Sequence, residues 1–370
     1  MKGLILAGGA GTRLRPITHT SAKQLLPIAN KPILFYVVEQ IAAAGIKDVG
    51  IVISADSAGE AIEQAVGDGS QFGIEATYIP QDAPRGLAHC ILIARNYLGD
   101  DDFVVYLGDN MLQQDLRSFV DRFHAQREHQ LELDGGNARS RAAAQILLAH
   151  VEDPRQFGVA ELDPEGRVIR LVEKPAAPPS DLALAGIYIF DRHIHDAVRA
   201  ITPSARGELE VTDAISWLLD HGHRVEHDIL EGWWIDTGKK DPLLHCNRLV
   251  LDTIQPRIDG RVDDDSRVEG RVVVEAGARL QHSVVRGPAI IGKHTLLVDS
   301  YVGPYTSIGD GCELHDAEIE HSVVLERSRI LGVHRIHDSL LGREVEVVRG
   351  DHRPRATRMM LGDHSRAELE

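Results

Sequence analysis

The sequence predicts an α/β protein, with a Rossmann-like, doubly wound mixed sheet followed by a parallel β-helix. Two observations predict this fold. Short apolar runs alternate with segments of helical spacing over the first 250 residues, and from about residue 254 apolar residues recur every six positions. A chain of 370 residues is also long for one domain, so we expect two, at 1–250 and 251–370.

The first expected strand, an apolar run at residues 3–7, leads into a glycine-rich loop. Glycines after a strand let successive backbone N–H groups point at an anion, and basic side chains nearby can neutralise a polyphosphate. The loop contains three glycines and three basic residues, which are Gly8, Gly9, Gly11, Arg13, Arg15 and Lys23. It is therefore a candidate nucleotide site.

Spacing excludes two common phosphate loops. A Walker loop would end in Gly-Lys-Ser/Thr, which is absent, and the dinucleotide fingerprint needs a third glycine where this chain has Leu14. From the loop residues alone, a tight surface turn beside a solvated basic patch remains an alternative.

Helix and strand signals then alternate along the chain. We expect helices at 33–45, 59–66, 87–97 and from about 206 through 219, and strands at 49–54, 75–79, 103–107 and 185–190. Thr212 or Asp213 could cap the last of these helices. Ligands of such a sheet bind beyond the C-terminal ends of its strands, where the glycine loop lies.

Three further residues follow expected strands. Gln81 could pair with a pyrimidine edge, with Gly86 letting a flat base approach the backbone, although Gln81 could also be a surface loop residue. Asp109 and Asp236 each leave an apolar strand near a glycine, and two carboxylates suit one hard cation such as Mg²⁺. Asp109 alone could instead be a helix cap or turn residue.

Glu173 and Lys174 offer a second set of polar groups. The carboxylate can accept hydrogen bonds from sugar hydroxyls, and the ammonium can hold a sugar phosphate. An adjacent Glu-Lys pair on a solvated edge is the alternative. Arg206 is either a second phosphate clamp or an exposed, unpaired arginine.

Two stretches, LILAGGAGTRLRPIT at 4–18 and AKQLLPIANKP at 22–32, resemble the N-terminal signature of the sugar-1-phosphate nucleotidyltransferases, most closely that of the glucose-1-phosphate thymidylyltransferases. The resemblance covers roughly residues 1–250 and includes the Gln and Gly-Leu-Ala at 81–88 and the Glu-Lys-Pro at 173–175. It implies a Mg²⁺-dependent transfer from dTTP to glucose 1-phosphate that releases pyrophosphate. UTP, an N-acetylhexosamine 1-phosphate, or a non-catalytic sugar-nucleotide-binding regulatory subunit remain alternatives.

The same resemblance implies site residues. Nucleotide binding falls to Leu6, Ala7, Gly8, Gly9, Gly11, Thr12, Arg13, Lys23, Gln81, Gly86 and Asp109. Sugar-phosphate binding falls to Gly108, Gly158, Glu173, Lys174, Tyr188 and Arg206. Asp109 and Asp236 would hold Mg²⁺, and Arg13, Lys23 and Lys174 would be catalytic. Residues 128–142 look like an insertion relative to this family, and we expect a surface loop without an assigned function.

The C-terminal part carries the six-residue repeat. Its apolar positions are Val268, Val274, Leu280, Val285, Ile291, Leu297, Val302, Ile308, Leu314, Val324, Ile330 and Ile336. This period predicts a parallel β-helix of about five coils after a linker or cap at 256–265. It resembles the left-handed hexapeptide-repeat helices that follow many nucleotidyltransferase domains.

We expect this β-helix to be an oligomerising or regulatory scaffold, and the protein to form a homo-oligomer through it and the catalytic domain. Some β-helices of this kind carry an acyltransferase site with a catalytic histidine. Four histidines keep that alternative open, which are His315, His321, His334 and His337. We expect poor order at the end of the polar tail that follows Asp351.

Charge and cysteine content narrow the class further. The formal net charge of −16 argues against nucleic-acid or anionic-membrane partners, which need a basic face. Cys90, Cys246 and Cys312 are odd in number and too widely spaced for a metal motif or disulfide framework. The N-terminal apolar run is too short for a signal peptide, so we expect a cytoplasmic protein.

Overall fold

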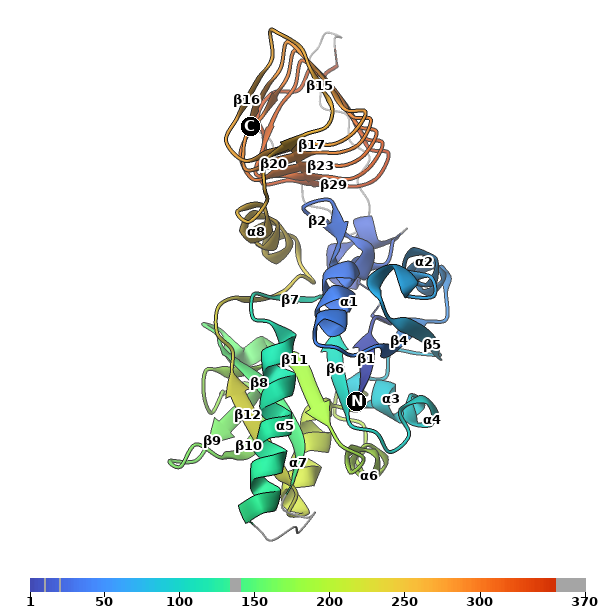
Figure 1. The fold of residues 1–370 in the computed structure, drawn as a ribbon, viewed down its shortest axis with the longest axis vertical. Helices are drawn as coiled ribbons and strands as arrows, with labels where there is room; N and C mark the ends of the chain where they lie inside the picture. The colour runs from blue at the N-terminus through green and yellow to red at the C-terminus, as the bar shows by residue number, and fades with distance from the viewer. Residues whose placement is uncertain (10, 20, 134–140, 351–370) are drawn as a thin grey trace. The chain divides into compact units, whose positions relative to one another are not determined.

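The structure, a computed structural model, describes residues 1–9, 11–19, 21–133 and 141–350. The chain forms two compact units (Figure 1). The first comprises Met1–Ala10 and Ile33–Ile235, and the second comprises Gly11–Pro32 and Asp236–Glu370. The glycine-rich loop is thus shared between the units. The division into functional domains at 1–250 and 251–370 stays a prediction.

The first unit contains the mixed sheet and most of the helices. Its strands are β1 (Lys2–Leu6), β4 (Asp48–Ser54), β5 (Glu75–Gln81), β6 (Phe103–Leu107), β7 (Asn110–Leu112), β8 (Ala142–His150), β9 (Gly158–Leu162), β10 (Val168–Glu173), β11 (Leu182–Phe190), β12 (Arg224–Ile229) and β13 (Trp234–Asp236), the last ending one residue inside the second unit. Its helices are α1 (Ile33–Ala43), α2 (Ser57–Val66), α3 (Leu87–Ile93), α4 (Arg95–Leu98), α5 (Leu116–Leu133), α6 (Ile194–Ala200) and α7 (Val211–Asp220).

The main sheet has the order β10-β9-β11-β6-β1-β4-β5, with β8 beside β11 and β12 beside β8. Strands β1, β4, β5 and β6 run parallel, whereas β11 pairs antiparallel with β6. The chain leaves β1 toward β4 and β5 and later returns on the other side of β1 to form β6. The C-terminal ends of β1 and β6 therefore meet at a switch point of the strand order, where ligands of open α/β sheets bind. The predicted mixed α/β sheet is confirmed.

Burial explains why these segments form strands. Leu4 and Ile5 of β1 are fully buried between the neighbouring strands, as are Val49 and Val52 of β4. Such strands are covered on both faces and read as continuous apolar runs, which is why the sequence located them. A helix buries one apolar stripe. In α1, this stripe includes Val37, Val38 and Ile41.

Four sequence predictions in this unit need correction. The helix expected from about residue 206 begins only at Val211, as α7. The expected helix at 87–97 is two helices, α3 and α4, because Ala94 has a ψ of −1° that interrupts the first. Residues 128–133 continue α5 and are not a loop, and 134–140 of the expected insertion lie outside the described residues. Neither Thr212 nor Asp213 caps α7: Glu210 is at the N-cap, and the Thr212 hydroxyl is instead directed to Glu173.

The second unit contains the hairpin β2 (Pro27–Ile28) and β3 (Lys31–Pro32), helix α8 (Lys240–Leu251) and the β-helix. The β-helix strands are β14 (Arg257–Ile258), β15 (Arg261–Val262), β16 (Arg267–Glu269), β17 (Val272–Val274), β18 (Arg279–Gln281), β19 (Val284–Arg286), β20 (Ala289–Ile291), β21 (Leu296–Val298), β22 (Tyr301–Val302), β23 (Thr306–Ile308), β24 (Glu313–His315), β25 (Glu318–Glu320), β26 (Val323–Val324), β27 (Arg329–Leu331), β28 (Ile336–His337), β29 (Leu340–Leu341) and β30 (Glu346–Val348).

These strands stack into three parallel sheets of six, six and five strands, as the left-handed β-helix prediction requires. Equivalent residues of successive coils pair, as Val274, Ile291 and Ile308 do. They are fully buried in one continuous core. The expected linker or cap at 256–265 already belongs to the first coil, since β14 and β15 pair with β17 and β18.

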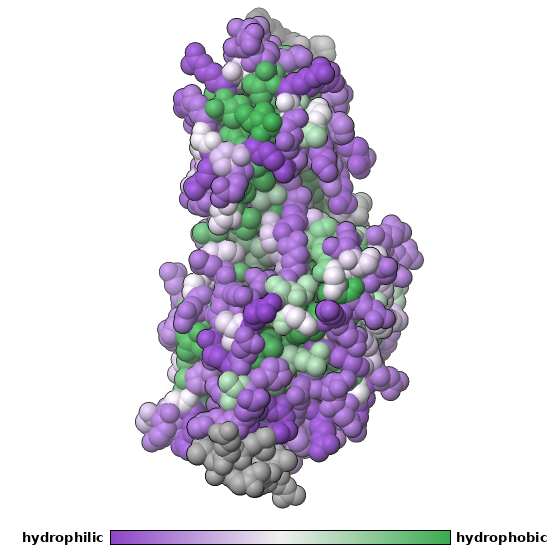
Figure 2. Space-filling model, in the orientation of Figure 1, coloured by the Kyte–Doolittle hydropathy of each residue, from purple (hydrophilic) through white to green (hydrophobic). Residues whose placement is uncertain are grey.

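The three thiols, Cys90, Cys246 and Cys312, are buried, and burial raises the pKa of each. No helix among the described residues has both the length and the apolar character needed to cross a membrane. On the face drawn in Figure 2, hydrophilic side chains predominate, in keeping with the acidic composition.

Candidate functional site

The first part of the glycine-rich loop leaves the sheet at the switch point. The Ala7 N–H donates to the carbonyl of Val52 at 2.8 Å, and the Gly108 N–H donates to the carbonyl of Leu6 at 3.0 Å. These bonds extend the pairing of β1 with both neighbours past the end of the strand. Gly8 and the turn after β6 consequently start from the same edge of the sheet.

Gln81 lies against Gly8. A Cβ added at Gly8 would lie 2.7 Å from Oε1 of Gln81, so a larger residue at position 8 would require this amide to move. The Gln81 side chain is buried, and its Nε2 lies 3.2 Å from Nδ1 of His89 in α3. An amide nitrogen can only donate, so the ring nitrogen must accept, as a neutral imidazole does. This hydrogen bond leaves Oε1 of Gln81 directed to the glycine loop.

His89 is a residue that the sequence prediction missed. Burial lowers its pKa, with the nearby charges of Asp82 and Arg85 having smaller and opposite effects. The neutral form that accepts from Gln81 is therefore favoured at neutral pH. The only sequence signal was its position in the helix that follows Gln81.

The sequence predicted that a nucleobase would approach the backbone closely at Gly86. In the structure, the backbone of Leu209 makes a close approach there. Gly86 has a φ of +100°, and an added Cβ would lie 2.4 Å from the carbonyl oxygen of Leu209. The Ala88 N–H donates to this same oxygen at 3.1 Å. Gly86 thus lets the start of α3 dock on the segment before α7. Its contact with a nucleobase stays a prediction.

Asp109 follows β6 and is mostly buried, with 9% of its surface exposed. Nδ2 of Asn110 donates to its Oδ1 at 3.2 Å, and Oδ1 of Asn110 accepts from the Trp234 indole nitrogen at 2.6 Å. Asn110 therefore links the Asp109 carboxylate to the Trp234 side chain within the first unit. The sequence prediction missed this role of Asn110.

In the second unit, the loop continues with Gly11, whose φ is +60°. The Thr18 hydroxyl donates to the Gly11 carbonyl at 2.7 Å, and an added Cβ at Gly11 would lie 3.2 Å from Cβ of Lys23. Thr12 and Arg13 are exposed in the short 3₁₀ helix Thr12–Leu14, and Lys23 is half-buried at the start of another, Lys23–Leu25. A compact turn thus carries both basic side chains.

Asp236 lies at the end of β13, where its Oδ1 accepts from the Gly238 N–H at 2.9 Å. Both Asp109 and Asp236 present carboxylate oxygens, the ligand type that a hard divalent ion such as Mg²⁺ requires. The chemistry of the donor set fits such an ion. Asp109 belongs to the first unit and Asp236 to the second.

Glu173, at the end of β10, is the centre of a charged cluster in the first unit. Its Oε1 lies 3.1 Å from Nη1 of Arg206 and 3.4 Å from Nζ of Lys174. Its Oε2 accepts from the Thr212 hydroxyl at 3.4 Å. The structure thus brings together three residues that the resemblance assigned to the sugar phosphate.

Arg206 is not an unpaired surface arginine, because it also lies 2.9 Å from Oε2 of Glu208 and 3.4 Å from Oε1 of Glu210. Burial raises the pKa of Glu210, with the charges of Glu173 and Glu208 adding to this rise against the lowering effects of Ser204 and Arg206. Three carboxylates therefore hold one guanidinium in place. An anionic ligand would find the guanidinium already oriented.

Two other predicted sugar-side residues lie around this cluster. Gly158 pairs with Glu173 across β9 and β10, and an added Cβ there would lie 2.7 Å from Cγ2 of Thr212. Tyr188 is buried in the core of the sheet and stacks on Phe190. Burial, together with the charge of Glu173, raises the pKa of the Tyr188 phenol.

A family model described as "Nucleotidyl transferase" matches residues 2–253. The chain belongs to this nucleotidyl transferase family. Among curated nucleotidyl transferases, the glucose-1-phosphate thymidylyltransferase of Streptomyces antibioticus is 54% identical over 370 residues, covering 100% of both chains. That of Streptomyces griseus is 53% identical over 369 residues, covering 100% of this chain and 99% of its own.

A solved structure from Bacillus anthracis, of a chain named for the same activity and bound to sucrose, aligns with a TM-score of 0.61 at 35% identity. It covers 70% of this chain and 98% of its own. The resemblance drawn from the sequence motifs is confirmed. Sugar-phosphate nucleotidyl transferases act on a nucleoside triphosphate and a sugar phosphate, and they generally use a divalent metal ion.

Proposed function

We propose that this protein is a glucose-1-phosphate thymidylyltransferase, which converts dTTP and glucose 1-phosphate into dTDP-glucose and pyrophosphate. The observation that carries the proposal is the 54% identity to the Streptomyces antibioticus enzyme over the full length of both chains. The arrangement of polar groups in each unit supports it, residue by residue.

Gln81 supports recognition of a pyrimidine. Its Oε1 is an acceptor fixed beside Gly8, because Nε2 is held by His89. Thymine and uracil each carry an N3–H that can donate to such an acceptor, as guanine does from N1, whereas cytosine and adenine carry no N–H at the corresponding ring nitrogen. A buried acceptor left unpaired costs binding free energy, so Gln81 favours thymine and uracil over cytosine and adenine. The same contact does not separate thymine from uracil.

The glycine-rich loop and its basic residues would bind the phosphates of the nucleotide. Backbone N–H groups of Gly8, Gly9 and Gly11, with Arg13 and Lys23, would hold the triphosphate and stabilise the departing pyrophosphate. Asp109 and Asp236 would bind the divalent ion, for which we propose Mg²⁺. When bound, this ion neutralises the charge that builds up between the reacting phosphates.

The sugar phosphate supplies the nucleophile. One of its oxygens attacks the α-phosphorus of dTTP, a new phosphorus–oxygen bond forms, and the bond to the β-phosphate breaks as pyrophosphate leaves. This phosphate is already ionised at neutral pH, so no general base is needed. Lys174 and Arg206 would orient it and Glu173 would accept from sugar hydroxyls, so positioning and electrostatics supply the acceleration.

The Asp109→Asn variant tests the role of the carboxylate. Asparagine keeps the side-chain shape but removes the charge that binds a divalent ion, so turnover should fall at least ~100-fold. Binding of glucose 1-phosphate, measured by calorimetry, should change by less than about threefold because that ligand is assigned to other residues. Asp101→Asn, which removes an exposed carboxylate of the same unit, is the matched control. A fully active Asp109→Asn enzyme would overturn the metal assignment.

We further propose that the protein forms a homo-oligomer in which the β-helix is an oligomerising or regulatory scaffold. Parallel coils end in unpaired strand edges, which another chain can cover. Light scattering coupled to size exclusion should give a mass above that of the 40.6 kDa chain. A 40.6 kDa species at micromolar concentration would rule this out.

A further inference from the structure

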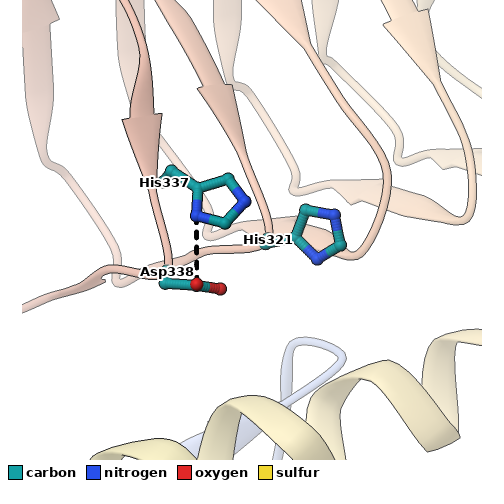
Figure 3. Close-up of side chains that lie close together, drawn as sticks. All are labelled: His321, His337 and Asp338. Carbon is teal, nitrogen blue, oxygen red and sulfur yellow. Dashed lines mark ion pairs between the residues drawn. The ribbon is translucent and has the colours of Figure 1, made fainter.

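Successive coils of the β-helix bring together His321, His337 and Asp338 (Figure 3). His321 and Asp338 occupy equivalent corners of neighbouring coils, with φ values of 50° and 46°. His337 is the last residue of β28, and it pairs in register with Glu320 of β25. The stacking of coils therefore places the His321 imidazole beside His337 and Asp338, which are neighbours in the sequence.

The distances suit a shared ligand. One ligand atom from each residue lies within 4.8 Å of the other two, and Nδ1 of His337 is 3.0 Å from Oδ2 of Asp338. The two imidazole rings are 5.0 Å apart between centroids. Tetrahedral zinc with bonds of ~2.1 Å separates its ligand atoms by roughly 3.4 Å. The ligand atoms are thus at most about 1.4 Å farther apart than in a closed tetrahedral site.

The surroundings favour imidazoles that act as ligands. His321 is half-buried, and its ring packs against the rings of Tyr305 and His337, with centroids 5.2 and 5.0 Å away. Oε1 of Glu320 lies 4.0 Å from Nε2 of His337, the ring nitrogen that does not face Asp338. At this distance the carboxylate can pair electrostatically with the ring but does not accept a hydrogen bond from it.

Three positively charged side chains near the cluster affect which metal ion it would bind. Lys240 donates from Nζ to the carbonyl oxygen of Asp338 at 3.0 Å, and Arg248 lies over the ring of Tyr305, against which His321 packs. Arg335 lines a cavity of about 180 Å³ with Glu320 and His337. Because these cations offset the negative charges of Asp338 and Glu320, we expect metal binding to depend mainly on the two imidazole nitrogens. Nitrogen ligands favour Zn²⁺ over Mg²⁺ or Ca²⁺.

We propose that His321, His337 and Asp338 form a zinc-class metal site on the β-helix, with its fourth position open to solvent or to another chain. The site shares no residue with the proposed nucleotidyl transfer site. The metal-site proposal can therefore be tested independently of the proposed activity.

The test is a Zn²⁺ titration of the full chain by calorimetry, with excess Mg²⁺ present to occupy sites that prefer hard ions. We expect one Zn²⁺ per chain with a dissociation constant below about 10 μM. The double variant His321→Asn/His337→Gln should weaken binding at least ~100-fold. The control His334→Gln should bind as the wild type does, since His334 instead faces Asp316 and Glu318.

Co²⁺ provides a second measurement that does not depend on a stability change. The wild-type protein should develop the intense visible absorption of a tetrahedral Co²⁺ site, and the double variant should not. Circular dichroism would verify that the variant retains its β-helix. Absence of binding up to 100 μM Zn²⁺, or equal binding by wild type and a folded double variant, would overturn the proposal.

Discussion

Nε2 of Gln81 donates a buried hydrogen bond to Nδ1 of His89 over 3.2 Å. This bond fixes the direction of the Gln81 amide, and with it the acceptor oxygen beside Gly8. His89 is thus a positioning residue for the base in the proposed reaction. His89 lies eight residues beyond Gln81 in the chain. Gln81 is the last residue of β5, and His89 lies in the first turn of α3.

Replacing His89 by leucine should therefore weaken dTTP recognition. Loss of one hydrogen bond of about 1 kcal/mol corresponds to a roughly fivefold higher KM for dTTP, with kcat nearly unchanged. His89→Gln, whose amide oxygen can accept from Gln81, should restore most of the affinity. Steady-state kinetics with both substrates would measure this. If His89→Leu and His89→Gln behave alike, His89 does not act through its acceptor nitrogen.

The same contact predicts a pH dependence. Burial holds the pKa of His89 below its usual 6.5, so the neutral ring and its bond to Gln81 persist above that pKa. Below it, the protonated ring has two donors and no acceptor, and the bond is lost. KM for dTTP should rise as the pH falls through this lowered pKa of His89, whereas His89→Gln should give a flatter profile. Identical acid limbs for the two proteins would contradict this assignment.

Arg206 should matter chiefly for the sugar phosphate. Removing a charged hydrogen-bond donor costs about 1.5–3 kcal/mol, so Arg206→Ala should raise KM for glucose 1-phosphate at least ~10-fold. KM for dTTP should stay within about twofold. Glu208→Gln is the control, because it removes one ion pair of Arg206 but keeps the guanidinium. An equal rise in both KM values would indicate a general loss of structure.

Asn247 of α8 anchors the β2–β3 hairpin, which follows Arg13 and Lys23 in the second unit. Its Oδ1 accepts from the Ala29 N–H at 2.8 Å and from the Ser307 hydroxyl at 2.9 Å. Asn30 adds a bond from its Nδ2 to the Ile308 carbonyl at 2.7 Å. Helix α8 and a β-helix coil therefore support the hairpin that follows Arg13 and Lys23.

Asn247→Leu should loosen this hairpin, because two donors lose their acceptor at a cost of about 1–3 kcal/mol each. Amide hydrogen exchange at residues 21–32 should accelerate while exchange in β1 stays unchanged. Under the proposed function, KM for dTTP should rise more than KM for glucose 1-phosphate. Asn247→Asp, which keeps the acceptor oxygens, should show a smaller change. Unaltered exchange at 21–32 in Asn247→Leu would exclude this support.

Much of the fold could be predicted because its elements have clear periods. Buried parallel strands such as β1 and β4 are continuous apolar runs, and the six-residue repeat of Val274, Leu280 and their successors permits little but a β-helix. The failures occurred where local signals compete. Thr212 resembles a helix cap, but its hydroxyl is directed to Glu173, which lies 39 residues away in the chain.

The residues of the proposed site likewise include some that could be predicted from the sequence and some that could not. Gln81 and Asp109 could be selected from the sequence because the family resemblance singles them out near strand ends, where ligands of such sheets bind. His89, Asn110 and Asn247 could not, since their roles depend on partners that only folding supplies. Asn110 contacts Trp234 across 124 residues, and Asn247 contacts the Ala29 backbone across 218.

Initial rates of pyrophosphate release test the central claim most directly. The measurement compares dTTP with UTP, each against glucose 1-phosphate and N-acetylhexosamine 1-phosphates, in the presence of Mg²⁺. We expect the highest kcat/KM for dTTP with glucose 1-phosphate, and dTDP-glucose formed in equal amount to pyrophosphate. A higher kcat/KM for another pair, or tight binding of substrates without pyrophosphate release from any pair, would contradict the account.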